Sequence, residues 1–166
     1  MKIIAGLGNH EPKYLKTRHN VGFIILDSFV KKHTLDWKKE PEFKSMVCKY
    51  EDFLLIKPLT YMNNSGIAVS AVLNFYKADP KDLYVIHDDL DLPFGKIKRQ
   101  RGAGAAGHHG VEDVILKVGT KNFNRIRVGI GRPHQENISP DEWVLLPLTQ
   151  EEFSVIDNLN LLDLLS

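Results

Sequence analysis

Two polar segments far apart in the chain contain the residue types of acid–base chemistry. The first, Thr17–Asn20, reads Thr-Arg-His-Asn and follows the opening apolar stretch, and the second, His87–Asp89, follows the apolar run 83–86. A histidine can take up a proton near neutral pH when a carboxylate orients its ring and stabilises its charged form. His19 and Asp88 are therefore a candidate acid–base pair. The simpler alternative is that His19 is a surface or helix-capping histidine.

A basic strip, Lys96–Arg101, and a glycine tract, Gly102–Gly110, come next. The strip has four cations in six residues. Cationic side chains bind phosphates, glycines allow a backbone to approach closely, and the start of a following helix can bind an anion. The two segments together favour a phosphate-bearing partner, although a strip of this kind is also typical of a solvated edge strand.

The sequence also contains residues of two other kinds of site. A metal site could use the acids and histidines of the second segment and the glycine tract, which are His87, Asp88, Asp89, Asp91, His108 and His109. None of these has a tight helical ligand spacing, so we expect no metal. A dinucleotide site is suggested by Gly6 and Gly8, but Glu11 stands where its fingerprint needs a third glycine. We expect no cofactor.

The composition favours one globular domain, because 166 residues with 43% hydrophobic residues can bury a sizeable core. No apolar run approaches the roughly 20 residues that span a bilayer. The N-terminus turns polar after a few residues and lacks the pattern of a secretory signal. The only cysteine, Cys48, excludes an internal disulfide and is expected to be a buried structural thiol. These features predict a cytoplasmic protein that does not contact a membrane.

The net charge of +1 hides an asymmetry along the chain. Residues 141–166 contain six acids and no lysine or arginine, so residues 1–140 hold 22 bases and 15 acids, a net charge of +7. A basic body of this kind permits nucleic-acid binding, which the overall charge would not indicate.

Alternating strand and helix patterns predict an α/β fold, a single domain with a mixed, mostly parallel twisted sheet and helices on both faces. In such sheets ligands bind beyond the carboxyl ends of the strands, so Asn9, His19 and Asp88 are expected to lie near one another. The predicted strands are 1–6, 43–50, 53–56, 83–86, 96–101 and 125–130. The predicted helices are 21–32, 64–76 (capped by Asn64 or Ser65), 110–118 and a terminal helix, 151–164.

Several motifs occur in one order over about residues 3–133. They are Gly6-Leu-Gly-Asn9, Tyr14, Thr17-Arg-His-Asn20 with Gly22, Tyr61-Met-Asn63 with Ser65-Gly66, His87-Asp-Asp-Leu-Asp-Leu-Pro93 with Gly95, Gly107-His108 with Gly110, and Phe123 followed by Arg125-Ile-Arg-Val-Gly-Ile-Gly-Arg-Pro133. In these motifs the chain resembles the bacterial-type peptidyl-tRNA hydrolases.

The resemblance implies an enzyme that cleaves the ester between a peptide and the 3′-terminal ribose of tRNA, recycling tRNA from aborted translation without a metal. It implies that His19 is the general base that activates water and that Asp88 orients it. It also implies substrate-binding residues and tRNA-binding residues. The substrate-binding group is Asn9, Tyr14, Met62, Asn63 and His109, and the tRNA-binding group is Lys98, Arg99, Arg101 and Arg127. We expect a monomer that binds the acceptor end and phosphates of peptidyl-tRNA.

Three departures from the family pattern are expected to matter. His109 stands where the family has a substrate-binding asparagine, and a histidine lacks the paired donor and acceptor of an amide. Gln100 stands where the family has a phosphate-binding lysine, and Arg99 and Arg101 should point to the opposite face of a strand from it. The C-terminal helical region is shorter than in the family. The main rival function is a non-catalytic RNA-binding relative, and a metal-dependent hydrolase is a more distant one.

Overall fold

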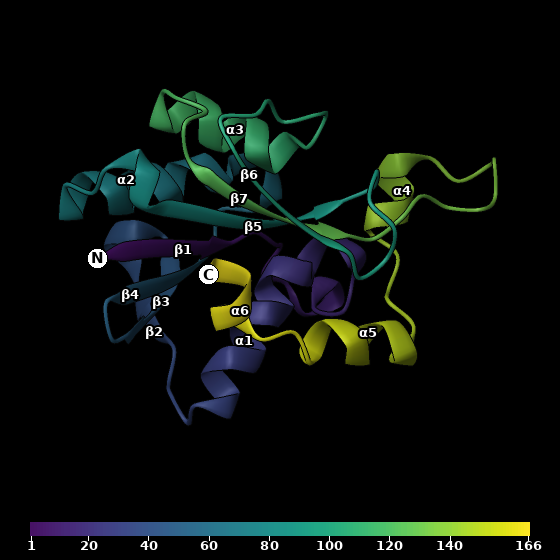
Figure 1. The fold of residues 1–166 in the computed structure, drawn as a ribbon, viewed down its shortest axis with the longest axis horizontal. Coiled ribbons are helices and arrows are strands. Elements are labelled where there is room, and N and C mark those ends of the chain that lie inside the picture. The colour runs from purple at the N-terminus through teal and green to yellow at the C-terminus, as the bar shows by residue number, and fades with distance from the viewer.

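A seven-stranded sheet with the order β2-β3-β4-β1-β5-β7-β6 is the centre of the computed structural model, which describes residues 1–166 (Figure 1). The central strands β4, β1, β5 and β7 pair in parallel. At one edge β3 pairs antiparallel with β4 and β2 with β3, and at the other edge β6 pairs antiparallel with β7. The strands are β1 Lys2–Gly6, β2 Lys38–Glu40, β3 Ser45–Tyr50, β4 Phe53–Pro58, β5 Leu83–Asp89, β6 Ile97–Arg101 and β7 Asn124–Gly129. The predicted mixed sheet with a parallel centre is confirmed.

Helices cover both faces of this sheet, as predicted. Figure 1 shows α2 and α3 on one face and α1, α5 and α6 on the other, with α4 beyond the carboxyl ends of the central strands. Their bounds are α1 Val21–Lys32, α2 Ser65–Tyr76, α3 His109–Val118, α4 Pro140–Val144, α5 Gln150–Asp157 and α6 Leu161–Leu165. None of these helices combines the length and the apolar character that crossing a bilayer requires.

The central strands are apolar on both faces because each face has its own core. In β1, Ile3 and Ala5 pack into the core beneath α2 and α3, while Ile4 packs into the core beneath α1. A strand buried on both sides reads as a continuous apolar run, which is why β1 and the first half of β5 were recognisable in the sequence. Cys48 is buried in the α1 core, as predicted, and burial raises the pKa of its thiol.

A glycine lets the start of α1 touch the ends of β1 and β5. A Cβ atom on Gly22 would lie 2.5 Å from the carbonyl oxygen of Ile86 and 2.7 Å from the backbone nitrogen of Leu7. Only glycine permits this approach. The short 3₁₀ helix Arg18–Asn20, which leads into α1, is thereby held at the carboxyl end of β5.

The prediction of a single terminal helix over 151–164 is wrong. The structure has two short helices, because α5 ends at Asp157 and α6 begins at Leu161, where the Asn160 side chain accepts a hydrogen bond from the backbone N–H of Leu162 at 3.0 Å. The apolar spacing continued across the break, so periodicity alone did not reveal it.

Asn64 is the N-cap residue of α2, one of the two predicted positions, but its side chain makes no capping hydrogen bond. The hydroxyl of Ser65 donates back to the carbonyl of Met62 at 2.7 Å. Instead the N–H of Gly66 donates to the carboxylate of Asp113 in α3 at 2.8 Å. The first turn of α2 is therefore satisfied by a tertiary contact, and this contact ties α2 to α3. Strand β2 and helix α4 were not predicted.

Candidate active site

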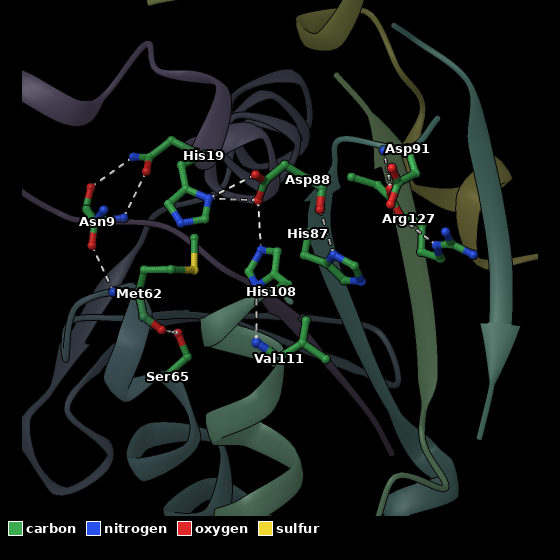
Figure 2. A network of polar contacts seen from close by, with 12 residues as sticks. Asn9, His19, Met62, Ser65, His87, Asp88, Asp91, His108, Val111 and Arg127 are labelled. Carbon is green, nitrogen blue, oxygen red and sulfur yellow. Dashed lines mark hydrogen bonds and ion pairs between the residues drawn. The ribbon is translucent and has the colours of Figure 1, made fainter. Parts of the chain in front are cut away.

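Asp88, at the end of β5, is the centre of a polar network (Figure 2). Its Oδ2 lies 2.9 Å from Nδ1 of His19, and its Oδ1 lies 2.9 Å from Nε2 of His108. Asp88 is 2% exposed, His19 14% and His108 9%. The predicted approach of His19 to Asp88 is thus seen in the structure, and His108 is a second partner that the sequence did not reveal.

The hydrogen bonds of this network fix where its protons sit. Nδ1 of His108 accepts from the backbone N–H of Val111 at 3.2 Å, so that nitrogen is bare and Nε2 carries the proton that is donated to Asp88. Nδ1 of His19 also faces the carboxylate and must donate to it. The other ring nitrogen of His19, Nε2, is left bare and free to take up a proton.

Charge and burial set the protonation of these groups. Burial alone would lower the pKa of His19, but the charge of Asp88 and its hydrogen bond raise it above the ordinary value, with a smaller contribution from Asp141. Burial would raise the pKa of Asp88, but His19 and His108 hold it well below its usual range. The neighbouring His87 is driven by burial to a pKa of about 3 and stays neutral; its Nδ1 donates to the backbone carbonyl of Asp88 at 2.8 Å. Asp88 is therefore a fixed anion.

Asn9 follows β1 and lies on the other side of His19 from Asp88 (Figure 2). Its side-chain Oδ1 accepts from the backbone N–H of Met62 at 2.8 Å, and its main chain exchanges two 2.8 Å hydrogen bonds with the side chain of Asn20. Since its oxygen is used, the group that Asn9 can offer a ligand is its amide N–H. Met62 is 2% exposed and lies below His19 in Figure 2, so it is part of the floor of the site.

The backbone just before Met62 is strained. Tyr61 has φ +65° and ψ 158°, a region that is almost restricted to glycine and costs on the order of 1–3 kcal/mol. Its hydroxyl donates to Glu11 at 2.7 Å, which anchors the side chain. Strain of this kind is kept where a neighbouring group must be held in place, here the Met62 N–H that orients Asn9.

Two adjoining cavities open beside His19. The first, called the His108 cavity, measures about 250 Å³ and lies among His87, Asp88, Gly107, His108 and Arg132. The second, called the Met62 cavity, measures about 540 Å³ and lies among Asn9, Tyr14, Tyr61, Met62 and Asn63. Both are also lined by His19, His109, Asp141 and Val144. A bound molecule reaching from one cavity into the other would pass the free nitrogen of His19.

The predicted substrate-binding residues all line the Met62 cavity, which together with the adjoining His108 cavity makes up the cleft. Tyr14, Asn63 and His109 lie on its rim, with Asn63 and His109 exposed. His109 begins α3, and its Nδ1 lies 3.3 Å from the carboxylate of Glu112 one turn later. This contact turns one ring nitrogen toward the helix and leaves the other for the cleft.

The predicted tRNA-binding residues divide between the two faces of the sheet. Lys98 is paired with Arg127 across β6 and β7 and shares its face, whereas Arg99 is paired with Ile126 on the opposite face. Arg101 lies on the face of Arg99 and donates to the Asn124 side chain at 3.2 Å. The two pairs of cations therefore start from opposite faces of the sheet at its β6 edge.

Arg127 is already bonded within the chain. Its Nε donates to Asp89 at 2.6 Å and its Nη1 donates to Gln100 at 2.8 Å. Gln100 thus supplies a neutral acceptor beside an arginine, where the family pattern has a cation. The remaining N–H groups of Arg127, with Lys98, are what this face offers a phosphate.

Arg18 fastens the loop of His19 to the C-terminal part of the chain. It is 5% exposed, and its guanidinium donates to the carbonyl of Pro147 at 2.7 Å and to Glu152 at 2.9 Å. It also stacks on the ring of Trp143 in α4, 3.8 Å from the ring centre. The wall of the cleft made by α4 is therefore attached to the residue next to His19.

The six residues of the metal hypothesis do not converge on one point. His87, Asp89, Asp91 and His109 have other partners, and only His19, Asp88 and His108 meet within the distances of a metal cluster. In this trio the ligand atoms bond directly to one another through two protons. A metal would have to displace both protons, so the geometry favours a hydrogen-bonded network.

Sequence reasoning missed three residues of the site. His108 was considered only as a metal ligand, although a histidine before a helix could have been read as an N-cap that fixes its own tautomer. Arg18 was missed because its bonds reach a segment more than 100 residues away, and Asp141 was missed because only the placement of α4 brings it to the cavity of His19. The sequence holds no local signal for such contacts.

Comparisons with known proteins identify one family. A family model described as peptidyl-tRNA hydrolase matches residues 3–163. A peptidyl-tRNA hydrolase of Lactobacillus gasseri is 41% identical over 161 residues, covering 95% of this chain and 85% of the relative, and one of Thermodesulfovibrio yellowstonii is 45% identical over 156 residues, covering 92% and 82%. The crystal structure of peptidyl-tRNA hydrolase from Acinetobacter baumannii superposes with a TM-score of 0.86 at 33% identity, covering 95% of this chain and 81% of that one.

Proposed function

Since the chain belongs to the peptidyl-tRNA hydrolase family, we propose that it hydrolyses peptidyl-tRNA with His19 as the general base and Asp88 as the group that orients it. The observation that carries this assignment is the bare Nε2 of His19 at the junction of two cavities, with its other nitrogen bonded to a buried carboxylate. That arrangement supplies a base of fixed tautomer beside space for a substrate.

The reaction starts with a water molecule beside Nε2 of His19. As the water oxygen forms a bond to the ester carbonyl carbon, one of its protons passes to Nε2, and the resulting imidazolium is stabilised by Asp88. The carbonyl oxygen becomes an oxyanion, for which the amide N–H of Asn9 is the donor that the structure leaves free. When the bond to the ribose oxygen breaks, that oxygen takes the proton from His19. The products are a free peptide and tRNA with a 3′-terminal hydroxyl.

The ester is held across the cleft by its neighbours. Met62 and Tyr14 shape the apolar side, and Asn63 and His109 supply hydrogen bonds at the rim. Lys98 and Arg127 on one face of the sheet, and Arg99 and Arg101 on the other, attract the phosphates near the acceptor end. The proposed active unit is a monomer. The proposed place of action is the cytoplasm, where peptidyl-tRNA arises.

The direct test is release of the acyl-amino acid from an N-acetyl-aminoacyl-tRNA, with unblocked aminoacyl-tRNA as the control substrate. Cleavage of the blocked ester in the presence of a chelator supports the proposal and counts against a metal-dependent hydrolase. Tight tRNA binding without cleavage would instead identify the chain as a non-catalytic RNA-binding relative.

Replacing His109 with asparagine should raise kcat/KM by about 2- to 10-fold, the value of one added hydrogen bond. An amide supplies a donor and an acceptor together, whereas the ring has one nitrogen turned toward Glu112. The measurement is kcat/KM on N-acetyl-aminoacyl-tRNA, with Glu112→Gln as the control that loosens the ring without changing it. A lower rate in both variants would mean that the His109–Glu112 contact has a role of its own.

Replacing Gln100 with lysine should tighten tRNA binding and make it more dependent on salt. The new cation shares a face with Lys98 and Arg127, so one more phosphate contact should steepen the slope of log K against log salt by about 1. Binding of uncharged tRNA over a salt series measures this. Gln150→Lys on α5 is the matched control for net charge. An equal change in both variants would show that position 100 does not face the tRNA.

A further inference from the structure

One acid of the cleft has no partner. Four carboxylates line the His108 cavity, those of Asp88, Asp89, Asp91 and Asp141. Asp88 is bonded to two histidines, Asp89 lies 2.6 Å from an arginine, and Asp91 lies 2.7 Å from another arginine. The exposed carboxylate of Asp141 has neither a hydrogen-bond partner nor an ion-pair partner within the chain. It is the negative charge that the cleft leaves for a ligand.

The position of Asp141 is fixed by the anchoring of α4. Trp143, two residues further along, donates from its ring nitrogen to the carbonyl of Gly131 at 2.9 Å. The guanidinium of Arg18 stacks on the same tryptophan, 3.8 Å from the centre of its ring. The helix itself is capped by Ser139, whose hydroxyl accepts from the N–H of Glu142 at 3.2 Å. Asp141 is therefore held in the wall of the cleft.

Asp141 lies close to the point of reaction. Together with His19 it lines both the His108 cavity and the Met62 cavity, so it stands where the two meet. Its charge is near enough to contribute to the raised pKa of His19. An acyl group whose ester lies at His19 therefore has Asp141 in its wall, whichever of the two cavities receives it.

We propose that Asp141 is a specificity-determining residue that favours acyl groups with a cationic side chain on the residue joined to the ester, as in lysyl or arginyl esters. This inference rests on the proposed function, because it places the ester at His19. A lysine or arginine side chain is long enough to leave the ester and meet a carboxylate on the wall of the cleft. An acidic side chain in the same place is repelled.

A purely structural role for Asp141 makes a different prediction. An acid in the first turn of a helix can interact with the helix dipole, and Asp141 is in the first turn of α4. That role would make its removal change stability and would leave the preference among substrates unaltered. Substrate preference therefore separates the two roles.

The experiment compares three substrates that differ only in the acyl side chain. N-acetyl-lysyl, N-acetyl-norleucyl and N-acetyl-glutamyl esters are made on one and the same tRNA, so that contacts to the nucleic acid cancel in every ratio. The wild-type enzyme should cleave the lysyl ester up to about fivefold better than the norleucyl ester in kcat/KM, the upper range for an exposed ion pair, and the glutamyl ester worse than both. The lysyl preference should shrink as salt is raised, since exposed charges are screened.

Asp141→Asn should bring the ratio of lysyl to norleucyl cleavage close to one. The substitution also lowers the pKa of His19 slightly, but that change is common to all three substrates and leaves the ratios intact. Glu142→Gln is the matched control, because it removes the same charge from the same helix and Glu142 does not line either cavity.

Each outcome decides the matter. A ratio that falls in Asp141→Asn and holds in Glu142→Gln supports the proposal. Turnover of all three substrates with an unchanged ratio in Asp141→Asn, or an equal fall in both variants, overturns it and leaves the proposed function standing. If the wild-type enzyme cleaved none of the three substrates, the proposed function would be overturned as well.

Discussion

Replacing His19 with alanine will lower kcat by about 100- to 10,000-fold, the usual contribution of a positioned general base, and leave tRNA binding nearly intact. The reason is that Nε2 of His19 is a bare nitrogen at the junction of the two cavities whose ring is oriented by the buried carboxylate of Asp88, while the cations proposed to hold tRNA lie on β6 and β7. Single-turnover cleavage of N-acetyl-aminoacyl-tRNA measures the first quantity, and binding of uncharged tRNA measures the second.

Two further variants separate the loss of the base from a loss of folding. His19→Gln keeps a side chain that can hydrogen-bond to Asp88 but has no base, and it should be about as slow as the alanine variant. His134→Ala, in an exposed loop, should behave like the wild type. A near-normal rate in His19→Ala, with its thermal unfolding unchanged, would remove His19 as the base.

The proximity of His19, Asp88 and Asn9 could be anticipated because it follows from topology. Residues just beyond the carboxyl ends of neighbouring parallel strands meet at one edge of a sheet, and β1 and β5 are neighbours here. The third member of the Asp88 network, His108, could not be placed in the same way. It precedes a helix at the end of a glycine tract whose path is set by tertiary contacts, such as the bond from the buried Arg125 to the carbonyl of Gly104 at 2.8 Å.

The elements that the sequence did not reveal are short and depend on distant contacts. Helix α4 has five residues and no apolar periodicity of its own, and it is held by Arg18 and by the Trp143 bond to Gly131. The break between α5 and α6 interrupts a run of apolar residues that keeps helical spacing, because Leu161 and Leu164 pack into the same core as Ile156. Short-range patterns predict long elements well, whereas these elements exist because of packing.

Replacing Asp88 with asparagine is expected to be as damaging as losing His19, with a loss in kcat of about 10,000-fold, the size seen when an orienting aspartate of a catalytic triad becomes an amide. Nε2 of His108 must donate, because its Nδ1 accepts from Val111. The introduced amide would therefore turn its oxygen toward His108 and its NH₂ group toward His19. Nδ1 of His19 would have to accept, which moves its proton to Nε2 and removes the base.

The pH dependence should change in a definite direction. Activity needs the unprotonated ring, so kcat/KM rises with pH through the pKa of His19, which in the wild type lies above its ordinary value because of Asp88. In Asp88→Asn the burial of His19 remains and the opposing charge is lost, so the pKa of His19 falls. The acid limb of the residual kcat/KM should therefore shift to lower pH. The measurement is kcat/KM from pH 5 to 9, a range that covers the titration of a histidine. An acid limb that stays in place would mean that another group controls it.

The loss of folding stability caused by Asp88→Asn should also depend on pH, because the shifted pKa values of Asp88 and His19 stabilise the wild-type fold. The lowered pKa of Asp88 stabilises the fold above its unfolded value of about 3.9, and this stabilisation is lost as the pH falls through the folded value. The raised pKa of His19 stabilises the fold below its unfolded value of about 6.5, and this is lost as the pH rises through the folded value. Urea unfolding should therefore show the largest loss of stability in Asp88→Asn between these two unfolded pKa values.

The role of His108 in this argument can be separated by a double-mutant cycle. If His108 forces the introduced amide to present its NH₂ group to His19, then removing His108 should free the amide to rotate and accept from Nδ1 of His19. Asp88→Asn should therefore cost much less activity in a His108→Ala background than in the wild type, a non-additive result expected of residues that share one hydrogen-bond network. Equal costs in the two backgrounds would show that the tautomer of His19 is set without His108, and that Asp88 acts through its charge alone.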